Sequence, residues 1–171
     1  MNALNKFWNR VNGVVEAILY LLVIALVVVV AAQVFWRYFL ENSLTWSEEL
    51  ARFMFIWVIF LGAEVTLRKK AHIAIDSLVN SLKGIPQLIL SLLIDLIIII
   101  FAVIVLYSGI ELVQATLNQY SSALHISIGL VYSAIPVSMA LMIVNLVFSI
   151  IGKIKNQSIS TDIQTNDISI D

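Results

Sequence analysis

The stretch 14–36, with the sequence VVEAILYLLVIALVVVVAAQVFW, decides the fold class of this chain. Its centre, residues 17–32, contains no polar residue larger than Tyr20. A helix of roughly 20 mostly apolar residues is long enough to cross the hydrocarbon of a bilayer. The run is longer than the apolar part of a usual signal peptide, and we therefore expect a retained membrane-spanning helix.

Three further segments are long and apolar enough to cross a bilayer, namely residues 46–67, 86–107 and 127–151. The chain of 171 residues is 61% hydrophobic and 12% charged, whereas ordinary soluble domains carry charge on about a quarter of their residues. So few charges cannot cover the surface of a soluble domain of this size. The sequence therefore predicts an all-α integral membrane protein with four transmembrane helices.

Composition and motifs exclude several function classes. The net charge of −1 provides no positive excess for nucleic acid phosphates, and the absence of cysteine excludes disulfides, thiol nucleophiles and thiolate metal sites. The sequence contains no Gly-x-Ser-x-Gly or Gly-x-x-x-x-Gly-Lys motif. His72 and His125 lie outside the apolar centres of the spans and cannot hold a haem between them. We expect no enzymatic activity and no catalytic, cofactor-binding or metal-binding residues.

The basic residues predict the orientation, because cytoplasmic loops carry an excess of Lys and Arg. Only Arg37 and Arg52 lie near the opposite ends of the spans. The other eight of the ten basic residues fall on one side: Lys6, Arg10, Arg68, Lys69, Lys70, Lys83, Lys153 and Lys155. We therefore expect both termini in the cytoplasm.

The segments outside the spans differ in character. Residues 72–83 place apolar side chains on one face of a helix and polar ones on the other, which predicts a short amphipathic interfacial helix between the second and third spans. Residues 156–171 are rich in Asn, Ser, Thr, Gln and Asp, a composition typical of a disordered tail. We expect one four-helix membrane domain, residues 1–155, followed by this polar tail.

The outer end of the second span carries a dense polar cluster. Thr45 and Glu48 have capping-box spacing, and Glu48 and Arg52 are four residues apart in the favourable order for a helical ion pair. One interpretation is a helix start that satisfies its own polar groups at the outer interface; the other is a docking surface. The candidate contact residues for another subunit or a periplasmic protein are Arg37, Trp46, Glu48, Glu49 and Arg52.

The inner end of the same span repeats this spacing. Glu64 and Arg68 are four residues apart, which predicts a structural ion pair rather than a mobile proton carrier. Arg68, Lys69 and Lys70 form a basic triplet. This triplet either binds anionic lipid headgroups or only enforces the topology, and the sequence favours neither interpretation.

Three other polar residues also need partners. His72 and Asp76 share a helix face, and we expect a structural pair because zinc needs at least three protein ligands. Asp95 lies well inside the third span and has no basic residue three or four positions away. We expect it to bond to Asn145 or Ser91, or to a polar group of a partner subunit.

Several short motifs, taken together, resemble one family, the small membrane subunits of tripartite ATP-independent periplasmic (TRAP) transporters. Their order and spacing make the resemblance specific, and they cover about residues 35–80 and 125–145. The motifs are Arg37-Tyr38, Leu44-x-Trp46-x-Glu48-Glu49-x-x-Arg52, Trp57, Gly62-Ala63, Arg68, His72-Ile73-x-Ile75-Asp76 and Tyr132-x-x-x-Pro136.

The resemblance implies a three-part uptake system in a bacterial inner membrane. A periplasmic binding protein captures an organic acid such as a C4-dicarboxylate or sialic acid, and a large membrane subunit imports it with sodium coupling. The small subunit, a separate chain here, binds and scaffolds the large one and brings no cofactor. A position beneath the periplasmic protein would give Glu49 or Arg37 a second role in docking.

Two alternatives stay open at this point. The first is an autonomous four-helix homodimeric transporter, which needs a membrane-embedded carboxylate, and Asp95 is the residue that qualifies. The second is a membrane assembly or regulatory protein without a transport role.

Overall fold

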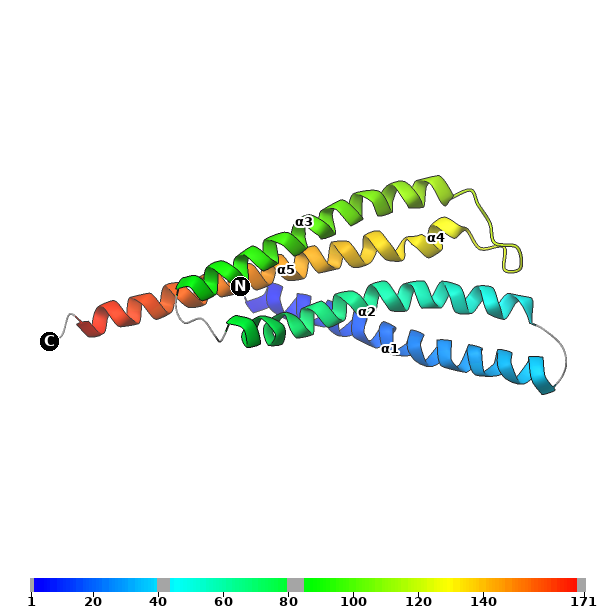
Figure 1. Cartoon of the computed structure of the whole chain (residues 1–171), viewed down its shortest axis with the longest axis horizontal. Coiled ribbons are helices and arrows are strands. Elements are labelled where there is room, and N and C mark those ends of the chain that lie inside the picture. The colour runs from blue at the N-terminus through cyan, green and yellow to red at the C-terminus, as the bar shows by residue number, and fades with distance from the viewer. Residues whose placement is uncertain (1, 40–43, 80–84, 169–171) are drawn as a thin grey trace.

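The computed structural model describes the backbone of residues 2–39, 44–79 and 85–168, and the side chains of residues 6–39, 44–69, 86–87 and 89–153. The described residues form helices and short connections (Figure 1). The helices are α1 (Asn2–Phe39), α2 (Thr45–Val79), α3 (Ile85–Thr116), α4 (Ile128–Tyr132) and α5 (Ala134–Ile168).

Four helical stretches are long and apolar enough to cross a membrane: Lys6–Phe39, Thr45–Lys69, Ile89–Thr116 and Ile128–Lys153. Each contains most or all of one span expected from hydropathy, so the predicted all-α fold with four transmembrane helices is confirmed. The helices continue beyond the apolar runs. Polar residues at their ends can extend the helix, with its backbone hydrogen bonds, into the membrane surface, where their side chains are not buried in lipid.

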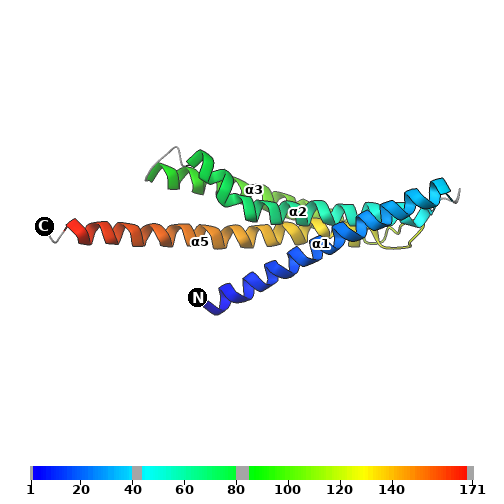
Figure 2. The same cartoon turned by 90° about the horizontal axis from the view of Figure 1, so that it is seen from below.

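The spans form an open layer rather than a closed bundle. Helices α1 and α2 make one antiparallel hairpin, α3 and α5 make another, and α2 packs against α5 (Figures 1 and 2). The order across the layer is therefore α1, α2, α5, α3, and within the described chain α1 and α3 do not contact each other. Many large apolar side chains consequently face outward.

The two ends of the layer differ. The start of α1, the end of α2, the start of α3 and the end of α5 lie toward one end of the molecule (Figure 1). This is the arrangement required for both termini to lie on the same side of a membrane. The assignment of that side to the cytoplasm stays a prediction.

Two apolar clusters hold neighbouring helices together. One lies between α3 and α5, and the other between α1 and α2. Because lipid tails are as apolar as these side chains, close packing rather than water exclusion stabilises such contacts within the bilayer. The buried members are Ala102, Met139, Met142 and Leu146 in the first cluster and Leu19, Leu61 and Val65 in the second.

The fourth span is interrupted near its outer end. Helix α4 ends at Tyr132 and α5 begins at Ala134. Pro136 has no backbone N–H with which to bond the carbonyl of Tyr132 four residues earlier. Two backbone hydrogen bonds span the junction between α4 and α5. The N–H of Ser133 donates to Gly129 O at 3.0 Å, and the N–H of Val137 donates to Ser133 O at 3.1 Å.

Helix also covers much of two segments outside the apolar spans. Helix α2 runs without a break to Val79, so residues 72–79 continue the second span. Residues 80–83 and the side chains of His72 and Asp76 lie outside the described residues, and an interfacial position stays a prediction. Helix α5 extends to Ile168 and covers most of residues 156–171, for which the disorder indicated by composition also stays a prediction.

Gly129 permits the closest contact between α3 and α4. A Cβ atom there would lie 2.9 Å from both the Leu117 Cα and the Val113 carbonyl oxygen, which belong to backbone and cannot move aside cheaply. Overpacking of this kind costs about 1–3 kcal/mol. We expect Gly129→Val to lower the unfolding midpoint of the purified protein in detergent, measured by circular dichroism. Gly152→Val is the matched control, because nothing lies within 4 Å of its Cβ position; equal midpoints would contradict the prediction.

Candidate functional site

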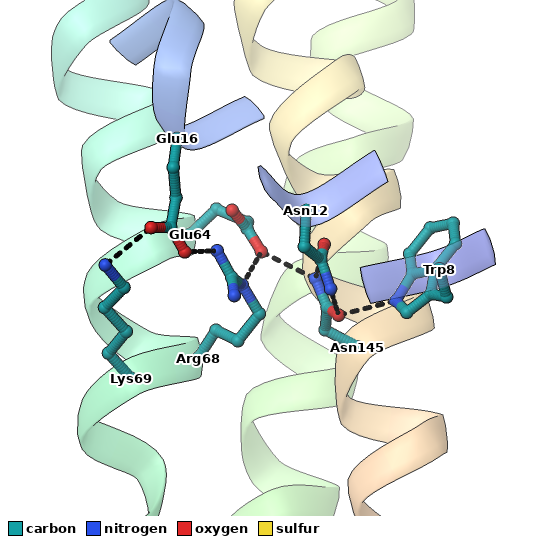
Figure 3. A network of polar contacts seen from close by, with 7 residues as sticks. All are labelled: Trp8, Asn12, Glu16, Glu64, Arg68, Lys69 and Asn145. Atoms are coloured by element: carbon teal, nitrogen blue, oxygen red, sulfur yellow. Dashed lines mark hydrogen bonds and ion pairs between the residues drawn. The ribbon is translucent and has the colours of Figure 1, made fainter. Parts of the chain in front are cut away.

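Polar side chains from three helices meet in the half of the molecule that contains the start of α1 (Figure 3). We call this set the inner network. Its residues are Trp8, Asn12 and Glu16 of α1, Glu64, Arg68 and Lys69 of α2, and Asn145 of α5.

Asn145 lies at the centre of the inner network. Its Oδ1 accepts hydrogen bonds from Trp8 Nε1 at 2.7 Å and from Asn12 Nδ2 at 2.9 Å. Its Nδ2 donates to Glu64 Oε1 at 2.6 Å and to Asn12 Oδ1 at 3.2 Å. An amide carries both donors and acceptors, so this one side chain joins α5 to α1 and to α2.

Glu64 is the buried charge of the network, with 1% of its surface exposed. Its Oε1 accepts the bond from Asn145 and lies 3.4 Å from Arg68 Nε. The two residues are therefore an ion pair at the spacing expected from the sequence. Within the described chain, Glu64 Oε2 has no hydrogen-bond partner.

Glu16 of α1 is the closest acidic partner of both Arg68 and Lys69 in the described structure. Arg68 Nη2 and Lys69 Nζ each lie 2.7 Å from one of its carboxylate oxygens. These bonds give Arg68 and Lys69 a partner within the chain and support a structural role. Lys70 has its side chain outside the described residues, and contact of the triplet with lipid headgroups stays a prediction.

A cavity of about 340 Å³ lies beside the inner network. Its lining includes Trp8, Glu64 and Asn145 of the network, together with polar Asn9 and Ser149 and apolar side chains such as Phe148. Trp8 and Phe148 stack with their ring centroids 5.8 Å apart. Among the described residues, no three His, Cys, Asp or Glu side chains are placed to hold a metal ion.

Asp95 is paired with a lysine, and not directly with Asn145 or Ser91, the two partners within the chain that the sequence suggested. It is 1% exposed, and its Oδ2 lies 2.5 Å from Nζ of Lys153 on α5, which also donates to Ser91 Oγ at 2.7 Å. Asn145 is engaged in the inner network instead, so the pairing of Asp95 with Asn145 is wrong. The long side chain of Lys153 extends from the end of the fourth span toward Asp95. A comparison of Asp95 with basic residues three or four positions away on its own helix cannot detect a partner on another helix.

At the other end of the molecule, Glu49 of α2 holds the connection between α3 and α4. Its carboxylate accepts hydrogen bonds from the backbone N–H groups of Ser122, Ala123 and Leu124, at 3.0–3.1 Å. The next residue, His125, has a positive φ of 53°. Glu49 therefore has partners within the chain, and its role in docking stays a prediction.

The start of α2 is stabilised differently from a capping box. Ser47 donates from Oγ to the Leu44 carbonyl at 2.7 Å, and Glu48 Oε1 lies 3.4 Å from Gln33 Nε2 of α1. Glu48 and Arg52 form no ion pair in the described structure, although their spacing permits one. Arg52 is exposed, as are the two other candidate contact residues of the outer end, Arg37 and Trp46.

The Asp95–Lys153 pair gives a prediction for stability. Lys153→Met leaves the Asp95 charge buried without its partner, which costs about 3–5 kcal/mol. Adding Asp95→Leu removes that charge, and we expect it to restore most of the stability in chemical unfolding of the purified chain. A double variant that loses the sum of the two single effects would contradict this prediction.

The Glu49 contact gives a prediction for local dynamics. Glu49→Ala removes the acceptor of three backbone N–H groups, and hydrogen bonds to charged groups contribute about 1.5–3 kcal/mol. We expect hydrogen–deuterium exchange of residues 122–124 to accelerate by about tenfold or more, since 1.4 kcal/mol corresponds to a factor of ten. Glu48→Ala is the control and leaves that exchange unchanged. Equal exchange in both variants would show that Glu49 does not hold the connection.

Comparison with known proteins places the chain. Residues 26–156 match the family model described as tripartite ATP-independent periplasmic transporters, DctQ component. A putative TRAP transporter small permease protein of Haemophilus influenzae is 27% identical over 146 residues, which cover 84% of this chain and 88% of that protein. The sialic acid TRAP transporter small permease protein SiaQ of Vibrio cholerae is 34% identical over 98 residues, 56% of this chain and 57% of SiaQ.

A longer relative contains the same region. The isethionate TRAP transporter permease protein DctMQ of Oleidesulfovibrio alaskensis is 29% identical over 140 residues, 77% of this chain. The chain spans only 22% of the length of DctMQ. Members of this family are transporter components and not enzymes. The chain thus belongs to the DctQ family, the small permease component of TRAP transporters.

Proposed function

We propose that this chain is a non-catalytic scaffold for the large permease subunit of a TRAP transporter. The complex imports an organic acid, such as a C4-dicarboxylate or sialic acid, that a periplasmic binding protein delivers. The single observation that carries the proposal is that each buried carboxylate of the spans has one oxygen bonded to a partner within the chain. They are therefore held in place rather than available to carry a substrate or an ion.

The carboxylates support this proposal one by one. Glu16 and Glu64 belong to the inner network, and Asp95 is paired with Lys153. An autonomous transporter of this size needs a carboxylate that can exchange protons or ions during the cycle, and Asp95 was the residue that qualified. Its buried ion pair favours the scaffold over that alternative. Sodium coupling then belongs to the large subunit.

The open layer also supports a scaffold. Helices α1 and α3 at its edges do not meet among the described residues, so no enclosed path for a solute is formed between them. Their outward side chains are large and apolar, which suits contact with lipid or with another membrane helix. Examples are Leu21, Ile24 and Val28 of α1 and Ile97, Phe101 and Ile104 of α3.

The longer relative DctMQ suggests how the partner is related to this region. A region similar to this chain makes up 22% of that permease, so the rest of the same polypeptide is several times larger. Regions joined in one polypeptide in one organism are good candidates for stable association as separate chains in another. We place the complex in the bacterial inner membrane with both termini of this chain in the cytoplasm.

Co-expression tests the scaffold directly. The chain, tagged at one end, is expressed with the large TRAP permease subunit of the same organism and purified in mild detergent. We expect a one-to-one complex, because the uncovered faces of the layer offer surface on which another membrane helix can pack. Recovery of the chain alone, or as a homodimer that transports without a partner, would overturn the proposal. Uptake by the complex that persists with Asp95→Asn would further exclude a proton relay at this residue.

A further inference from the structure

One face of α2 is left uncovered by the rest of the chain. Its exposed residues follow one another at intervals of three or four, which places them on a single side of the helix. The buried residues Leu61 and Val65 lie on the opposite side, against α1. We call the uncovered face the α2 stripe: Glu48, Arg52, Phe55, Ile59, Ala63 and Thr66.

Arg52 is the unusual member of the α2 stripe. It lies about two helical turns inside the span Thr45–Lys69, and it is exposed. None of the ion pairs among the described residues includes it. Glu48, one turn nearer the outer end, is instead close to Gln33 of α1. A cation that faces lipid at this depth is unfavourable, so the guanidinium favours an acidic partner, and none of the ion pairs among the described residues supplies one.

The inner part of the α2 stripe suits close contact with another helix. Ala63 and Thr66 are small and exposed. Small residues let two membrane helices approach, and a Thr hydroxyl can bond across the contact. Phe55 and Ile59, between these residues and Arg52, add large apolar surface. Lipid alone requires neither the small residues nor the charge.

We propose that the α2 stripe is the surface on which a transmembrane helix of the large permease subunit packs, with a carboxylate of that helix facing Arg52. This inference rests on the proposed scaffold function and assigns its contact surface. Charge complementarity sets the chemistry of the partner. A second copy of this chain could offer Glu48 to Arg52, but the relative in which this region is 22% of one longer permease favours the large subunit.

Cross-linking tests the surface cleanly, because the chain contains no cysteine. Ile59→Cys and Ala63→Cys lie on the α2 stripe, and Ile104→Cys, on α3 with 60% of its surface exposed, is the control. Each is co-expressed with a cysteine-free large subunit into which single cysteines are introduced along its helices. We expect oxidative cross-links to one helix of the large subunit from the stripe and none from Ile104. Cross-links from the control alone, or from the stripe only to a second copy, would overturn the inference.

Charge substitutions test the role of Arg52 in the same complex. We expect Arg52→Glu to lose most of the co-purified large subunit and Arg52→Lys to retain it. Arg10→Glu, at an exposed position of α1 outside the α2 stripe, is the matched control and retains the complex. The unfolding midpoint of the isolated chain stays unchanged in all three variants, because no ion pair within the described chain is removed. Recovery unaffected by Arg52→Glu would overturn the role of the charge.

The two proposals fail in different ways. If the unaltered chain does not bind the large subunit, the scaffold function is wrong. If it binds, but neither the stripe cysteines nor Arg52→Glu has an effect, the scaffold function stands and the assignment of its surface is wrong.

Discussion

Burial of the Glu64 carboxylate within a membrane span is the constraint on which the inner half of the structure depends. A charge at this position is tolerated only with partners close by. Asn145 supplies a hydrogen bond from α5 and Arg68 supplies a positive charge from the next turn of α2. Arg68 in turn bonds to Glu16 of α1. The contacts that begin at this one carboxylate therefore connect three helices.

The same rule operates at two other places. Asp95 and Lys153 join α3 to α5, and Glu49 joins α2 to the connection that leads into α4. Together these contacts connect all four spans: the inner network joins α1, α2 and α5, and the Asp95–Lys153 pair adds α3. Apolar packing alone discriminates weakly between helix neighbours in lipid, so these polar contacts add specificity to the pairing of the helices. They also leave the carboxylates engaged in structure, which is the property expected of a scaffold.

The sequence predicted what is local along the chain. Hydropathy located the spans because each helix satisfies its own backbone within the bilayer, and the spacing of Glu64 and Arg68 indicated their pair because it lies within one helix. Contacts between helices were not accessible in this way. Arg68 and Glu16 are 52 residues apart and Lys153 and Asp95 are 58 apart. Asn145 and Lys153 both lie on α5, so the alignment of α5 against α3 and α2, which the sequence does not give, decides that Lys153 rather than Asn145 pairs with Asp95.

The central claim is that the buried carboxylates hold the scaffold together and take no part in moving substrate or ions. Its most direct test is uptake by proteoliposomes that contain the large subunit together with this chain carrying Glu64→Gln, normalised to the amount of assembled complex. The account predicts uptake per complex equal to that of the unaltered protein, with any loss appearing as less complex. A fully assembled complex that no longer transports would contradict it.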